Sequence, residues 1–285
     1  MKKNIKLGLG QILIEGGEPS RNLKRAIKVI KEAKSENCDI ILLPECLDLG
    51  WTHPSAKKEA ETIPGKWSDL ISNIANEMNI WVCAGLTEKK ENKIYNAAVL
   101  FDNSKNIVLK YRKINILSDA LSFYNIGNRL NVVDTPFGKI GVNICSDNYI
   151  DSLHIGHALA RMGAEIILSP SSWTVDYDTI VGKKNSYGEK WIEPYSILAK
   201  LYNLVVCATT SVGTIVGGPF EGRKMMGGSL VVNKSGVLLE GEYNEYAGSL
   251  STINIDLYDK ITKGTQIGES LKSKGYRFDS ISDIS

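Results

Sequence analysis

Short apolar runs alternate along the chain with longer stretches in which apolar residues recur at helical spacing. The runs predict strands over residues 6–14, 40–43, 80–86, 165–168 and 205–210, and the helical spacing predicts helices over residues 19–35, 67–78, 152–162 and 191–201. Further pairs of strands are predicted around turns at 103–105, 136–138 and 233–236. Such alternation, with hairpins among the crossovers and no linker, is typical of an α/β protein built on layered sheets.

Three of these strands end at a residue whose side chain could take part in catalysis. The run at 40–43 leads to Glu45, the alternating run that begins at Ile107 leads to Lys113, and the strand ending at 144 leads to Cys145. On one rim of a sheet they would supply a general base, a cation for an oxyanion and a nucleophile. A strand-to-helix turn also places the thiol near backbone N–H groups, which favour thiolate. Taken singly, the acid and the ammonium are equally compatible with solvated surface positions, and the cysteine with a small core residue.

The segments around these residues resemble a known family. Leu-Pro-Glu45, Tyr-Arg-Lys113 and Gly-Val-Asn-Ile-Cys145-Ser-Asp are similar, in order and spacing, to the three motifs of the nitrilase, or carbon–nitrogen hydrolase, superfamily. Two more matching segments lie at 163–171 and 227–236, so the resemblance covers about residues 5–257. It implies a four-layer αββα sandwich over residues 1–256. Residues 257–285 would then form a C-terminal extension at an oligomer interface.

The resemblance also implies roles for the matched residues. Cys145 would be the nucleophile, Glu45 the general base and Lys113 the cation that stabilises the tetrahedral intermediate, with the backbone N–H of Ser146 completing the oxyanion site. Many members carry a second glutamate shortly after the lysine, and this chain has none there. Asp119 lies in that segment with a shorter side chain, so we expect it only to assist.

Several residues near the three motifs are candidates for the substrate pocket. Trp51 follows the Glu45 strand end, Tyr149 follows the cysteine loop, and Ser171 and Trp173 follow the strand predicted at 165–168. Each of these residues could equally be packing. The polar stretch 174–189 comes next, and its place beside the expected site makes it a candidate specificity lid.

These features predict a thiol-dependent hydrolase that cleaves a small linear amide through a thioester. Cys145-Ser-Asp resembles the amidase branches of the family, whereas nitrilases typically have Trp-Glu after the cysteine. Hydrolysis of an N-carbamoyl amine, hydrolysis of a nitrile and acyl transfer remain alternatives on the same three residues. A catalytically inactive binding or scaffold protein is the alternative from a different class. The missing second glutamate favours that alternative, and the presence of Glu45, Lys113 and Cys145 argues against it.

Composition fits an ordinary intracellular enzyme. The 285 residues are 43% hydrophobic and 23% charged, with a formal net charge of +2 that does not suggest a nucleic-acid partner. No apolar run approaches the roughly 18 residues of a membrane span. Five cysteines without Cys-x-x-Cys spacing fit a reduced, cytoplasmic setting. His154 and His157 share a helix face but lack further ligands nearby, so we expect no metal and no cofactor.

The sequence also predicts a twofold homodimer. The helix expected at 152–162 is apolar on more than one face and needs a second packing partner, and the tail after Asp256 adds apolar residues without a place in the sheets. Family members generally pair through such helices and C-terminal segments. Light scattering should report about twice the 31.3 kDa chain mass, and deletion of residues 257–285 should weaken association. A monomer at micromolar concentration would contradict this prediction, as would a tail that folds back on its own chain.

Overall fold

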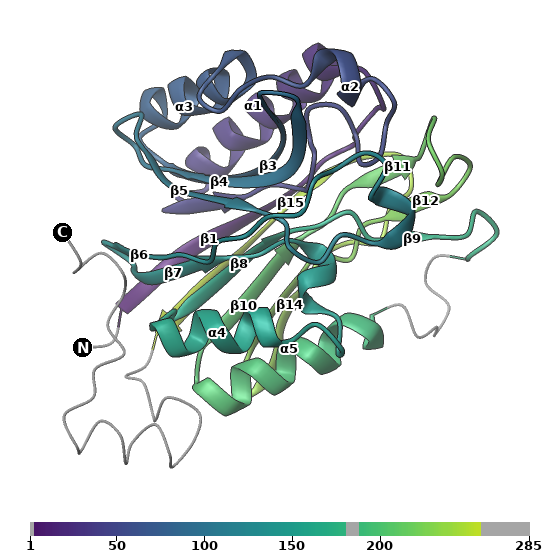
Figure 1. Cartoon of the computed structure of the whole chain (residues 1–285). Helices are drawn as coiled ribbons and strands as arrows, with labels where there is room; N and C mark the ends of the chain where they lie inside the picture. Colours follow the sequence, from purple (N-terminus) through teal and green to yellow (C-terminus); the bar gives the residue numbers. More distant parts are fainter. Residues whose placement is uncertain (1–2, 181–187, 258–285) are drawn as a thin grey trace.

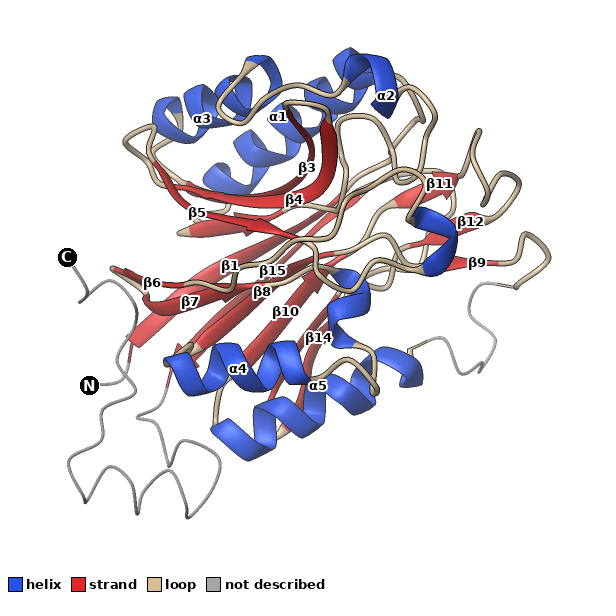
Figure 2. Ribbon diagram, viewed as in Figure 1, coloured by secondary structure: helices blue, strands red, loops and turns tan. Residues whose placement is uncertain are grey.

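The computed structural model describes residues 3–180 and 188–257, which form four layers (Figures 1 and 2). Helices α1, α2 and α3 cover one face, two sheets lie in the middle, and helices α4 and α5 cover the opposite face. The predicted αββα sandwich is therefore confirmed. The predicted C-terminal extension falls almost entirely outside the described residues.

The first sheet has six strands, and its centre is parallel. Strands β1, β2 and β3 run parallel, the hairpin β4–β5 continues the sheet antiparallel on one side, and β15 pairs antiparallel with β1 on the other. The order is β15 (Ser249–Leu257), β1 (Lys3–Gln11), β2 (Ile40–Leu42), β3 (Trp81–Lys90), β4 (Lys93–Phe101) and β5 (Ile107–Arg112).

The second sheet repeats this pattern. Strands β7, β8 and β10 are parallel, β13–β14 is the antiparallel hairpin, and β6 is the antiparallel edge. The order is β14 (Gly236–Glu240), β13 (Leu230–Asn233), β10 (Val205–Thr209), β8 (Ile166–Pro170), β7 (Gly138–Val142) and β6 (Val132–Thr135). A third, three-stranded sheet of β11 (Val212–Thr214), β12 (Lys224–Met226) and β9 (Thr174–Val175) lies beside these layers.

The helices bury apolar stripes against the outer faces of the two large sheets. Helix α1 (Pro19–Ser35) begins with proline at its first turn, where no backbone N–H is needed, and packs with α3 (Lys66–Glu77) over the first sheet. The short α2 (Ala56–Glu59) lies near them, and α4 (His154–Met162) and α5 (Glu189–Tyr202) cover the second sheet. Within the described residues, no helix combines the length and apolarity needed to cross a bilayer.

The main core lies between the two large sheets. It joins inward-facing side chains of β1, β2 and β4 to those of β7, β8 and β10, so the sheets are held face to face by apolar contact. The fully or almost fully buried members include Leu7, Leu9, Leu42, Leu100, Ile140, Val142, Leu168 and Val206. This packing fixes the position of strand ends in one sheet relative to those in the other.

Helix α4 finds its second packing partner within the chain. Gly156 of α4 lies so close to α5 that a Cβ there would be 2.4 Å from a methyl carbon of Leu198. The two apolar faces that suggested a partner subunit are thus covered by the sheet and by α5. Helix α5 itself exposes two apolar side chains, Ile197 and Leu201.

Candidate active site

Glu45 is positioned by the turn that follows β2. The turn is joined to β3 by backbone hydrogen bonds, in which Gly85 donates to Pro44 at 3.0 Å and accepts from Leu47 at 2.9 Å. The approach is so close that a Cβ at Gly85 would lie 2.5 Å from Glu45 Cα, which explains the glycine. The backbone N–H of Glu45 also donates to the carbonyl of Ser171, at 3.2 Å. Backbone contacts to both large sheets therefore set the place of this carboxylate.

Glu45 and Lys113 form a buried ion pair. Lys113 directly follows β5, and its Nζ donates to Glu45 Oε1 at 2.7 Å, with the two residues 1% and 0% exposed. Asn96 of β4 donates a second hydrogen bond to the same oxygen, at 2.6 Å. Burial lowers the pKa of Lys113, but the neighbouring carboxylates of Glu45 and Asp147 help to raise it above its usual value. The lysine is thus a buried cation.

Cys145 begins a short 3-10 helix, Cys145–Asn148, after β7, with a left-handed φ of 45° and 7% exposure. Its backbone N–H donates to Ser169 Oγ at 3.2 Å. Burial first, and then the charge of Glu45, raise the pKa of the Cys145 thiol to about 12, although Lys113 and the backbone N–H of Ser172 act in the opposite sense. The nearby N–H groups thus act toward thiolate, as the turn suggested, but burial and the neighbouring carboxylate outweigh them.

Asp147 holds the cysteine turn against the segment after Lys113. This fully buried carboxylate accepts hydrogen bonds from Tyr111 Oη at 2.7 Å, from the backbone N–H of Asn115 at 2.9 Å and from the backbone N–H of Ile144 at 2.9 Å. Ser146 Oγ adds a bond of 2.7 Å to the carbonyl of Asn115. The strand end from the first sheet and the nucleophile turn from the second are thereby joined.

A small cavity opens beside the thiol. Its volume is about 50 Å³, enough for only a few heavy atoms. Three residues predicted as pocket candidates line it, namely Trp51, Tyr149 and Trp173. The remaining lining residues are Leu117, Cys145, Ser172, Thr174, Lys190 and Trp191.

Two other predicted residues lie apart from this cavity. Ser171 is fully buried behind it, where its backbone groups bond to Glu45 and Thr209. Asp119 is exposed on a short 3-10 helix, Ser118–Ala120, and does not contribute to the lining of the cavity. Ser146 is buried directly after Cys145, and the predicted oxyanion role of its N–H stays a prediction.

Sequence reasoning missed an aromatic stack and a lysine at the cavity. Trp191 of α5 stacks on Trp173 with 4.4 Å between ring centroids, and Tyr149 stacks on Trp191 with 5.2 Å between ring centroids. Lys190 is exposed, and its Nζ lies 4.5 Å from the Tyr149 ring centre and 3.5 Å from Tyr149 Oη. Asn96 was missed as well, although a polar residue inside the apolar run of β4 could have indicated a buried polar contact.

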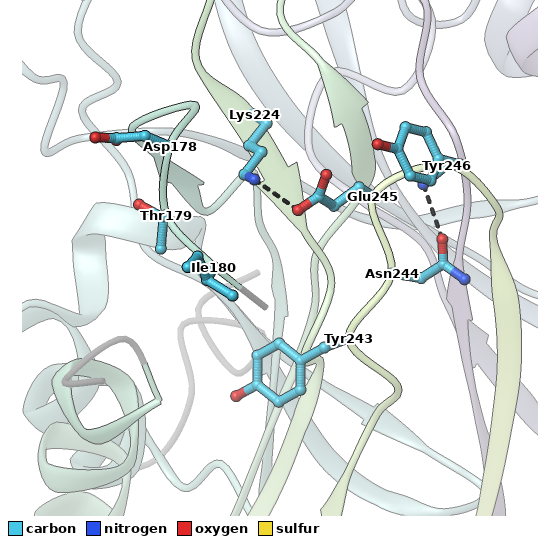
Figure 3. A pocket seen from close by; sticks show the side chains of 8 residues that line it. All are labelled: Asp178, Thr179, Ile180, Lys224, Tyr243, Asn244, Glu245 and Tyr246. Carbon is cyan, nitrogen blue, oxygen red and sulfur yellow. Dashed lines mark hydrogen bonds and ion pairs between the residues drawn. The ribbon is translucent and has the colours of Figure 1, made fainter. Parts of the chain in front are cut away.

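A larger cleft of about 460 Å³ lies elsewhere, between the segment after β9, strand β12 and the segment after β14 (Figure 3). Lys224 and Glu245 pair across it at 2.6 Å, and none of its lining residues is a nucleophile beside a base. Within the described residues there is also no group of three or more His, Cys, Asp or Glu side chains able to hold a metal. The chemistry therefore concentrates at Cys145.

The protein belongs to the carbon–nitrogen hydrolase family, whose sequence model matches residues 6–260. The omega-amidase NIT2-A of Xenopus laevis is 32% identical over 184 residues, covering 60% of this chain and 64% of the relative. A nitrilase of Pyrococcus abyssi is 31% identical over 165 residues, covering 56% and 62%. The matched region thus spans less than two thirds of the length of these relatives.

Solved structures show the same fold. The amidase of Nesterenkonia sp. AN1, in a form with acrylamide added to its active-site cysteine, superposes with a TM-score of 0.77 at 16% identity and covers 95% of this chain and 100% of its own. Nit3 of Saccharomyces cerevisiae, a member of branch 10 of the nitrilase superfamily, superposes with a TM-score of 0.73 at 23% identity, covering 95% and 94%. The family resemblance seen in the motifs is confirmed.

The raised pKa of Cys145 predicts an unusual pH dependence of alkylation. In the unsubstituted protein, the rate at which iodoacetamide labels Cys145 should still rise above about pH 10. Glu45→Gln removes the charge that raises this pKa and leaves Lys113, which lowers it, so the midpoint should move to lower pH. Peptide mass spectrometry measures the labelling. Glu59→Gln, at an exposed acid, should leave the curve unchanged, and a midpoint near neutrality in the unsubstituted protein would contradict the prediction.

Proposed function

We propose that this protein hydrolyses a small linear amide through a thioester on Cys145. The observation that carries the proposal is the buried Glu45–Lys113 ion pair beside a protonated thiol at a small cavity. A thiol with a raised pKa needs a base at the moment of attack, and Glu45 is the carboxylate whose charge acts on it. The family membership and the omega-amidase relatives support the same chemistry.

In the proposed mechanism, Glu45 accepts the thiol proton as Cys145 Sγ attacks the carbonyl carbon of the amide. Lys113 Nζ, which has two N–H bonds beyond the one to Glu45, and the backbone N–H of Ser146 stabilise the oxyanion. Protonated Glu45 then gives its proton to the departing nitrogen, and ammonia or an amine leaves. Water attacks the thioester while Glu45 takes its proton. Collapse of that second intermediate releases the acid, and the thiol regains its proton from Glu45.

For the substrate, we propose an amide whose acyl chain carries a carboxylate at its far end. A cavity of about 50 Å³ accepts the amide end alone, so the rest of such a substrate would lie at the mouth. Lys190 is the exposed cation of the lining, where it would pair with a carboxylate. The relatives named omega-amidases support this class of substrate. N-carbamoyl amine hydrolysis, nitrile hydrolysis and acyl transfer are the rival reactions on the same residues.

The homodimer stays a proposal. We propose that its interface includes α5 in place of α4. Ile197 and Leu201 are 37% and 44% exposed on this helix, and Ile150, close to the cysteine turn, is 56% exposed. Two copies of the chain that met through these residues would cover apolar surface. The predicted mass of the pair in solution tests this arrangement.

Substitutions of the three central residues test the mechanism. Cys145→Ala should abolish turnover of any amide that the unsubstituted protein cleaves, with little change in circular dichroism or melting temperature. Glu45→Gln and Lys113→Ala should each lower kcat at least about 10²-fold. Lys113→Ala should also lower the melting temperature, because it leaves Glu45 buried without its partner. Asp119→Asn should cost less activity than Glu45→Gln. Near-normal turnover by Cys145→Ala would refute the mechanism.

Charge at Lys190 tests the substrate class. The comparison uses succinamate, which carries a carboxylate, and butyramide, a neutral amide of the same chain length. Lys190→Met should lower kcat/KM for succinamate about fivefold, the upper end for an exposed ion pair, and change that for butyramide by less than about twofold. Lys190→Arg keeps the charge and should keep the preference. Equal losses with both amides would rule out charge recognition at this position.

A further inference from the structure

Asn96 contacts both members of the buried ion pair. It lies within β4, where it is fully buried, and its backbone carbonyl accepts the N–H of Lys113 at 2.8 Å. Its side-chain Nδ2 donates to Glu45 Oε1 at 2.6 Å. One residue thereby fixes the backbone of the lysine and the side chain of the glutamate, although they follow different strands of the first sheet.

The two donors to Glu45 converge on a single oxygen. Lys113 Nζ and Asn96 Nδ2 both bond to Oε1, at 2.7 and 2.6 Å. Oε2 is buried and, within the described residues, makes no hydrogen bond. Since a carboxylate held at one oxygen by two donors cannot exchange its oxygens without losing both bonds, Oε2 stays available for a proton.

The other end of the Asn96 amide carries a cost in stability. Oδ1 is buried and has no hydrogen-bond partner among the residues that the structure describes. An unpaired buried acceptor costs free energy of folding, and turning the amide over would place Oδ1 against the carboxylate. A side chain selected for stability would pair both ends or be apolar. Asn96 instead donates from Nδ2 to Glu45 while its Oδ1 stays unpaired.

We infer that Asn96 is a positioning residue that holds Glu45 so that Oε2 takes the proton of the Cys145 thiol. The inference rests on the proposed function, in which Glu45 is the base. Asn96 itself does not line the cavity. It acts by keeping Oε1 of Glu45 hydrogen-bonded and Oε2 oriented. A neutral donor suits this role, because it adds no second positive charge beside Lys113.

The test compares Asn96→Leu with Asn96→Ala. Leucine has nearly the same shape, removes the donor and removes the unpaired oxygen, so kcat should fall at least about tenfold while KM changes less than about twofold and the melting temperature holds or rises. Alanine leaves space that a water molecule can enter and donate from, so it should lower the melting temperature but lose less kcat than leucine. The two variants should therefore rank in opposite orders for activity and for stability.

Gln11→Met is the matched control. Gln11 is 2% exposed, and its amide is paired at both ends, through a bond of 2.8 Å to the Glu242 carbonyl and one of 2.9 Å from Ser229 Oγ. Its loss should lower the melting temperature and leave kcat unchanged. If Asn96→Leu keeps kcat within about threefold, or if both Asn96 variants lose activity in the order in which they lose stability, Asn96 only packs and the inference is wrong. An unsubstituted protein that turns over neither succinamate nor butyramide would refute the proposed function itself.

Discussion

The ion pair between Glu45 and Lys113 is the interaction on which the remainder of the site depends. Two opposite charges separated by 2.7 Å and withdrawn from water are expensive to bury, and removal of either one leaves an uncompensated charge. Both residues follow strands of the first sheet, whereas Cys145 follows a strand of the second. The apolar core between the sheets therefore does more than stabilise the chain, because it sets the distance between the charged pair and the thiol on which it acts.

The sequence predicted the parts of the site that follow strand ends. Glu45, Lys113 and Cys145 each stop an apolar run, and such runs are local patterns that a single sequence displays. Asn96 reaches Glu45 because of the register between neighbouring strands, and Trp191 reaches Trp173 because of helix packing, which are not local properties. Strand β15 was also missed, since its pairing partner β1 lies at the other end of the chain. The raised pKa of the thiol is likewise not a local property, because burial depends on the whole fold.

The segment after Lys113, which carries no glutamate, forms part of the cavity wall through Leu117. Asp119 is exposed and does not line the cavity. Ala120, the residue after Asp119, is buried with Tyr124 in a small cluster that includes Trp51. Tyr124 Oη in turn accepts the backbone N–H of Thr52 at 2.8 Å. The segment that would carry the glutamate thus supports one aromatic wall of the pocket through packing.

Gly85 gives the site a property that matters for protein engineering. The backbone of the Glu45 turn lies where a side chain of β3 would be, so main-chain contacts locate this turn. The residues that shape the cavity, such as Leu117, Thr174 and Lys190, come from other segments. Recognition and chemistry are consequently separable in this fold. A library that varies the cavity wall can sample new substrates while the acid–base geometry beneath it stays constant.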